Sequence, residues 1–170
     1  MPRAAVRTVD RVRPFLVEIV LLALALLLAI ALLEHRSEGG ASRGDVLASW
    51  ARTPGALNPA VTQATIGSTI CTRGWTRTIR PPTDYTNALK VRQLREYGLR
   101  GPLSAYQEDH LISLELGGNP VDARNLWPEP YPRASAVDRI ENDLNRRVCS
   151  GELTLAEAQR RESELKHTRG

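Results

Sequence analysis

The chain has 170 residues, a length that fits one folded domain with an appendage. Its formal net charge is +4, and half of that excess lies in residues 1–33, where four arginines face Asp10 and Glu18, which leaves residues 34–170 nearly balanced at +2. The composition therefore excludes a domain that attracts nucleic acid through its overall field, so any such binding must come from local patches.

An apolar stretch, FLVEIVLLALALLLAIALL, covers residues 15–33 and is interrupted only by Glu18. A helix of this length, at about 1.5 Å per residue, matches the hydrocarbon core of a bilayer, which predicts a transmembrane helix. Arginines precede the stretch and mixed charges follow it, so the positive-inside rule keeps residues 1–14 in the cytoplasm and exports the rest. A cleaved signal peptide is the alternative, because a basic region and the sequence AIA at 29–31 are both present. Both interpretations place the C-terminal domain outside the cytoplasm.

Residues 34–57 are rich in Gly, Ser and Pro and lack hydrophobic periodicity, which predicts a flexible tether. We expect the folded domain to cover residues 58–170. Its first segment, residues 58–71, predicts either a helix from Thr62 or a short strand, and its threonines oppose the helix.

The chain contains two cysteines, Cys71 and Cys149, and neither belongs to a C-x-x-C pair. This spacing argues against a zinc ribbon. An exported domain meets oxidising conditions, so we expect the two to form a disulfide, with two separate buried thiols as the alternative.

A helix is predicted for about residues 86–97, and its non-apolar positions carry Lys90, Arg92 and Arg95. The wider segment 71–100 holds seven basic and two acidic residues. Such a segment either follows a phosphate backbone or forms a solvated face, and the sequence leaves both open.

The segment AYQEDHLISLEL predicts a strand that ends near residues 110–113. A loop at 117–120 and a second short strand at RNLW follow it. A helix is predicted over residues 134–149, and TLAE at 154–157 has the form of a capping box that opens a last helix. The order strand, loop, strand, helix is a ββα unit inside an α+β fold.

Asp109 and His110 end the first predicted strand. Phosphodiester cleavage needs a base to deprotonate water, a cation to stabilise charge, and a cradle for the polyanion. A neutral imidazole accepts a proton near neutral pH, so His110 is the candidate base. A hard divalent cation, Mg²⁺ first and Mn²⁺ as an alternative, prefers oxygen ligands such as Asp109 and an Asp or Asn of the following helix.

The run EDHLISLELGG, followed by RNLWPEP, resembles the HNH endonucleases, also called ββα-metal or His-Me finger nucleases. The segments TICTRGWTRTIRPP, YTNALK, LREYG and ENDL resemble an exported bacterial subgroup of HNH-like proteins, so the resemblance covers most of residues 58–160. It implies that Asp109 helps to bind the metal, that His110 is the general base, and that Asn125 orients the imidazole.

The chain departs from this family pattern at the third motif position. Where a typical member carries its final His or Asn, this sequence has Ala134. The candidates stand later on the helix, with Asn142 the first choice as a metal ligand, Asp138 the second, and Glu141 a further acidic side chain nearby.

These observations predict a membrane-anchored, exported, metal-dependent endonuclease that cleaves DNA, with RNA as an alternative substrate. Arg124 and the basic residues Lys90, Arg92 and Arg95 would contact phosphates, and cleavage should be weakly specific because no base-reading module is evident. No protein partner is indicated. The alternative is an exported binding module that keeps the scaffold without turnover, which the missing close third ligand and the near-neutral charge favour.

Overall fold

The computed structural model describes residues 12–37 and 46–169. These residues belong to two separate units, one within residues 1–40 and the other within residues 41–170. Residues 1–11 of the expected cytoplasmic tail and residues 38–45 of the expected tether lie outside the described part of the chain.

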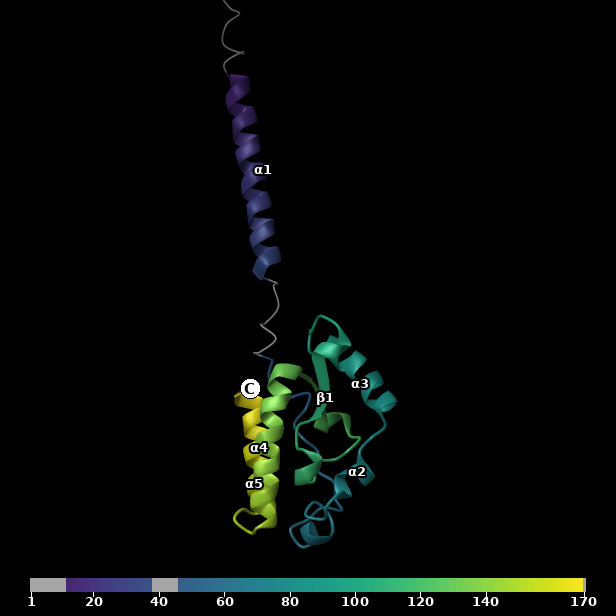
Figure 1. Ribbon diagram of the computed structural model, residues 1–170. Coiled ribbons are helices and arrows are strands. Elements are labelled where there is room, and N and C mark those ends of the chain that lie inside the picture. Colours follow the sequence, from purple (N-terminus) through teal and green to yellow (C-terminus); the bar gives the residue numbers. More distant parts are fainter. Residues whose placement is uncertain (1–11, 38–45, 170) are drawn as a thin grey trace, which may run out of the picture. The chain divides into compact units, whose positions relative to one another are not determined.

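The first unit contributes one described helix, α1 (Val12–Ser37), which contains the apolar segment 15–33 (Figure 1). Its run of Leu and Ala favours a helix because these residues lose little conformational freedom in one. The side chains described in it, those of residues 17–31, are exposed. Within the described residues, no helix combines the length and the hydropathy that a membrane crossing requires.

The second unit is of the α+β class (Figure 1). β1 (Tyr106–His110) and β2 (Leu126–Pro130) form a two-stranded antiparallel sheet in which His110 lies opposite Leu126. α4 (Tyr131–Cys149) follows β2 directly, so the strand, loop, strand, helix order predicted from the sequence is confirmed. The other helices are α2 (Trp75–Ile79), α3 (Thr83–Glu96) and α5 (Leu155–Thr168).

Proline has different effects at two points of this unit. β2 continues through Pro128 and Pro130, beyond the RNLW segment predicted for it, because each strand of a two-stranded sheet has a free edge on which a missing N–H costs nothing. α4 begins earlier than expected, with Pro132 in its first turn. The N–H groups of a first turn have no acceptor within the helix, so the N–H that proline lacks is not needed there.

The segment 58–71 forms neither of the elements expected for it beyond a short 3₁₀ turn at Ile66–Ser68. Its threonine hydroxyls bond to the local backbone instead. The Thr65 hydroxyl donates to the Ala60 carbonyl at 2.9 Å, and the Thr69 hydroxyl donates to the Thr65 carbonyl at 2.7 Å. Such bonds compete with a helix, as the threonine content suggested.

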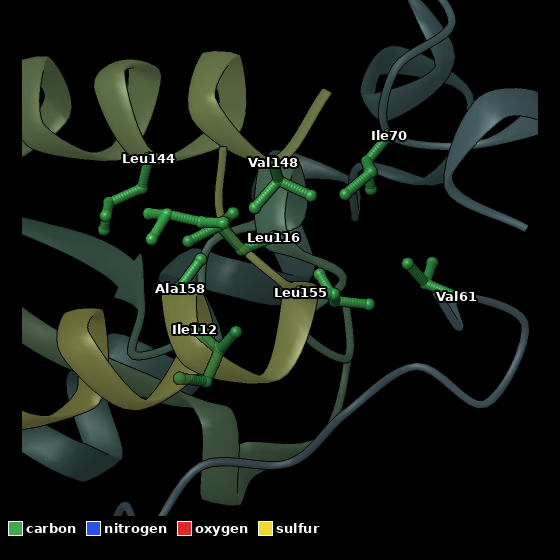
Figure 2. Packing of buried hydrophobic residues seen from close by; sticks show 9 residues of the cluster. Val61, Ile70, Ile112, Leu116, Leu144, Val148, Leu155 and Ala158 are labelled. Carbon is green, nitrogen blue, oxygen red and sulfur yellow. The ribbon is translucent and has the colours of Figure 1, made fainter. Parts of the chain in front are cut away.

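The main hydrophobic core lies where α4 and α5 meet the segment 58–71 and the loop after β1. Figure 2 shows side chains from these elements pointing toward one another, among them Val61, Ile112, Leu144 and Leu155. The predicted disulfide between Cys71 and Cys149 is present and joins segment 58–71 to the end of α4.

Residues 46–53, which the sequence assigned to the tether, pack against α5. The Ala48 amide donates to the Lys166 carbonyl at 3.1 Å, and the Ala48 side chain is buried. The Trp50 indole stacks on the His167 imidazole with ring centroids 3.6 Å apart. The packed unit therefore includes residues ahead of Asn58, where the sequence placed its start.

Candidate active site

A pocket of about 300 Å³ opens where β1, the loop after it and α4 meet. Polar side chains from all three elements line it. They include Asp109 and His110 from β1, Ser113 from the loop, and Asp138, Glu141 and Asn142 from α4. The fold thus brings together the residues that the sequence proposed as the general base and the metal ligands.

His110 is 6% exposed, and its Nε2 atom lies 3.1 Å from the Pro120 carbonyl oxygen. A carbonyl oxygen can only accept, so Nε2 carries the proton and Nδ1 is left as the acceptor. Burial lowers the pKa of His110 below 6.5, although the Asp109 carboxylate opposes that effect. The imidazole is therefore neutral at neutral pH, as a general base requires.

Asn125 is fully buried directly before β2, and its side chain fixes the loop after β1. Its amide oxygen accepts from the Ile112 N–H at 2.9 Å, and its amide nitrogen donates to the carbonyls of Ile112 and Asn119 at 3.0 Å each. The same loop carries Pro120, which holds His110. Asn125 thus contacts the loop that holds the imidazole, and its hydrogen-bond partners there are backbone groups of Ile112 and Asn119.

Gly118 allows this loop to close. A Cβ atom at this position would lie 1.7 Å from the Ile112 carbonyl oxygen and 2.7 Å from the Asn125 amide nitrogen. Any larger residue would therefore separate the loop from Asn125.

Asp109 pairs with an ammonium group from the last helix. Its Oδ2 atom lies 2.9 Å from Lys166 Nζ, and its Oδ1 atom accepts from the Gln107 amide at 3.2 Å. Burial is the largest single influence and opposes ionisation of Asp109, but the Lys166 charge and the hydrogen bonds from Glu129 and Lys166 together outweigh it and hold the pKa of Asp109 at about 2. Asp109 is therefore an ionised carboxylate that already has a cation beside it.

The two ligand candidates on α4 are more open to solvent. Asp138 and Asn142 are exposed on the helix, and the Asn142 amide nitrogen donates to the Asp138 carbonyl at 2.6 Å. This contact leaves the Asn142 side-chain oxygen as the atom that can bind a cation. Between them on the helix, Glu141 is buried, and its carboxylate lies 2.5 Å from Lys166 Nζ.

The pocket fits a cation that needs few protein ligands. Among the described residues, no three His, Cys, Asp or Glu side chains come together as a ready-made metal cluster. The pocket does offer carboxylate and amide oxygens, and the buried Ser113 hydroxyl in its wall has no hydrogen-bond partner among the described residues. Mg²⁺ commonly binds through one or two carboxylates while it keeps waters and takes substrate phosphate oxygens, so this donor set suits it better than zinc.

The four basic residues proposed as phosphate contacts lie elsewhere. Lys90 is buried and its ammonium donates to the Tyr106 carbonyl at 3.0 Å. Arg92 pairs with Glu96 on α3, Arg124 pairs with Asp122, and Arg95 is exposed on α3. None of the four lines the pocket that contains His110.

Arg80 is the basic side chain in the pocket wall, and sequence reasoning included it only within a broad basic segment. It is exposed at the end of α2. Burial is the main cause of the lowered pKa of His110, and the Arg80 charge lowers it further. A proline pair directly after it was the available signal, because that pair ends α2 and places Arg80 in an extended position beside the pocket.

Comparisons of the chain with protein-family models, with characterised proteins and with solved structures found no match. A proposal for its function therefore depends on the pocket chemistry described above and on the motif resemblance.

Proposed function

We propose that this protein is an endonuclease that hydrolyses phosphodiester bonds of DNA, with RNA as a second possible substrate. The single observation that carries the proposal is the His110 imidazole. It is buried, its Nε2–H is committed to the Pro120 carbonyl, and it lines a pocket together with the ionised carboxylate of Asp109 and further oxygen donors of α4. This is the arrangement that a general base for water needs.

In the proposed reaction, the Nδ1 atom of His110 takes a proton from a water molecule. The water oxygen forms a bond to phosphorus, the bond between phosphorus and one sugar oxygen breaks, and the departing oxygen takes a proton from solvent. Asn125 contributes by keeping the loop closed, and thereby the Pro120 carbonyl in place. Arg80, in the same pocket wall, would hold the phosphate in position through its guanidinium.

A divalent cation, with Mg²⁺ first, would be held by Asp109 together with Asp138 and Asn142 of α4. When bound, such an ion stabilises the negative charge that develops on the phosphoryl oxygens. The HNH-like motif supports this assignment, and the oxygen donors of the pocket are suitable for it.

The proposal also includes a location. The apolar sequence of residues 15–33 would anchor the domain at a membrane with its C-terminal part outside the cytoplasm. A nuclease in that position would meet environmental DNA and spare the chromosome. Alkaline carbonate extraction of cells would test it, because a peripheral protein is released by that treatment and an integral one is retained.

A nicking assay tests the activity directly. The full-length protein should relax supercoiled plasmid with Mg²⁺ or Mn²⁺, and a chelator should stop it. His110→Ala should lower the rate by about 100-fold or more, the usual contribution of a positioned base. His35→Ala is the matched control, because His35 belongs to α1 in the other unit of the chain and does not line the pocket. Full activity in His110→Ala would exclude the assigned base.

A second candidate function is a binding module without turnover. It is favoured by one observation, which is that Asp109 and Glu141 both contact Lys166 and so already have a cation. Plasmid that is retained on the protein but never nicked, under any divalent metal, would support this alternative.

A further inference from the structure

The ammonium of Lys166 is fully buried beneath the pocket. Its three N–H donors meet three acceptors, namely the Asp109 carboxylate at 2.9 Å, the Glu141 carboxylate at 2.5 Å and the His110 carbonyl at 2.5 Å. An ammonium group has three donors, so the group is fully satisfied. Lys166 on α5 thus joins the end of β1 to the middle of α4.

Lys166 lies behind the pocket wall rather than in it. Asp109, Glu141 and Ser113 line the pocket, whereas Lys166 and Glu162 do not. Glu162, one turn earlier on α5, lies 3.6 Å from the ammonium and accepts from the Ser113 N–H through both oxygens at 3.0 Å. α5 therefore supports the pocket from its inner side, through charges that never reach the substrate.

We propose that Lys166 is a positioning residue: its ammonium fixes the Asp109 and Glu141 carboxylates in the pocket wall and keeps the affinity of the pocket for a divalent cation low until a phosphate group joins. The inference rests on the proposed function for the identity of that phosphate. It assigns to the last helix a role that the motif around His110 does not include.

The physical reason is repulsion between like charges. A divalent cation at Asp109 would lie close to the Lys166 ammonium, which shares the same carboxylate, and the repulsion is strong where water is excluded. A phosphate in the pocket supplies negative charge and further oxygen ligands, which offsets the repulsion. Binding of the cation and binding of the polyanion should therefore strengthen each other by the same factor.

The first measurement is the affinity of the full-length wild-type protein for Mn²⁺ without nucleic acid, followed by the electron paramagnetic resonance of free Mn²⁺. We expect a dissociation constant weaker than about 100 μM. A wild-type site that binds Mn²⁺ in the low micromolar range would overturn the inference, whatever the variants show.

The second measurement uses Lys166→Met, which keeps an unbranched side chain only one atom shorter and removes its charge. Mn²⁺ should bind this variant at least about tenfold more tightly than the wild type, because the competing charge is gone. A purely structural role for Lys166 would leave the affinity unchanged or weaken it. Arg160→Met is the matched control, since it removes one positive charge from an exposed position of α5 and should leave the Mn²⁺ affinity unchanged.

Removal of the ammonium leaves three buried carboxylates without their counter-ion, which destabilises the folded state. A second variant is therefore needed to separate loss of folding from loss of the charge. The double variant Lys166→Met/Glu162→Gln removes one carboxylate together with the ammonium and keeps the two that line the pocket. It should fold, by circular dichroism, and show the same tightening of Mn²⁺ binding. Unchanged affinity in the folded double variant would overturn the inference.

The outcomes also separate the inference from the proposed function. Plasmid nicking that depends on His110, with Mn²⁺ affinity unchanged by loss of Lys166, would refute the positioning role and leave the nuclease in place. Tighter Mn²⁺ binding in the Lys166 variants, with no nicking by the wild type, would refute the nuclease alone.

Discussion

Glu108 and Asp109 are adjacent in β1, yet their carboxyl groups have opposite protonation states at neutral pH. Burial raises the pKa of Glu108 to about 8, whereas at Asp109 the Lys166 charge and hydrogen bonds together overcome burial and lower the pKa to about 2. Successive residues of a strand point to opposite faces, so only Asp109 meets the ammonium from α5. Both Glu108 oxygens are buried without a hydrogen-bond partner among the described residues.

The raised pKa of Glu108 makes a prediction about stability. The protonated form of Glu108 is favoured in the folded state. Its contribution to the free energy of unfolding is therefore fully present below pH 4.5 and is lost as the pH rises toward 8. Glu108→Gln should therefore match the wild type near pH 4 and be more stable at pH 8.5 by about 2 kcal/mol, less than the full shift because the side chain is partly solvated. Urea unfolding at both values measures this, and an equal difference at both would contradict it.

The lowered pKa of His110 makes a prediction about activity. Only the neutral imidazole accepts a proton, so nicking should persist as the pH falls through 6.5 and decline at a lower value. The measurement is kcat/KM for an oligonucleotide between pH 5 and 8 at fixed Mn²⁺. An acid limb centred above 6.5 would contradict the assignment of His110 as the base.

Arg80 should affect both substrate binding and that acid limb. Arg80→Ala removes a positive charge from the pocket, so KM should rise about tenfold, a change of 1.4 kcal/mol. The acid limb should also move upward, because Arg80 is one of the groups that lower the pKa of His110. Arg95→Ala is the control, as an exposed arginine on α3 outside the pocket, and should change neither quantity.

Asn125→Ala should weaken both the fold and the site. The substitution leaves buried backbone groups of Ile112 without partners, at a cost of about 2 to 4 kcal/mol in unfolding free energy. Nicking should fall even at temperatures where circular dichroism shows the protein folded, because the loop that holds His110 is released. Asn87→Ala, on an exposed position of α3, is the control. Normal nicking by folded Asn125→Ala would separate the loop from catalysis.

The disulfide should stabilise the fold mainly by restricting the conformations of the unfolded chain. Cys71 and Cys149 are 78 positions apart, so replacing both by serine should lower the unfolding free energy by an idealised 4 to 5 kcal/mol, roughly. The pocket residues around His110 do not include either cysteine. Nicking at low temperature should therefore survive, and its loss in a folded double variant would show that the disulfide also shapes the site.

The ββα unit could be predicted because its signals are local. Alternation before His110, the glycine pair after it and the periodicity of residues 134–149 each act over a few residues. Thr154 caps the last helix as the TLAE motif predicts, because its hydroxyl accepts from the Glu157 N–H. β1 and α4 both belong to this unit and lie against each other, so the pocket residues that they carry are close together.

The rest depended on long-range packing. Glu162 and Lys166 are four positions apart on a charged helix, a pattern that usually indicates a solvated surface pair, and only the tertiary fold buries both. Lys90 on α3 was also expected at the surface, where its charge would reach a phosphate, but the helix turns it toward β1. Charge patterns alone do not distinguish a buried ion pair from an exposed one.

The contact between residues 46–53 and α5 has a practical consequence for anyone who prepares this domain recombinantly. A truncation placed at residue 58, where the composition changes, would remove Trp50, which stacks on His167. It would also remove the segment whose Ala48 N–H donates to the Lys166 carbonyl. The Lys166 side chain contacts Asp109 and Glu141 of the pocket wall. A cut at residue 58 would therefore disturb the pocket, although the pocket residues lie far from the cut in sequence. Expression boundaries should therefore be set ahead of Val46.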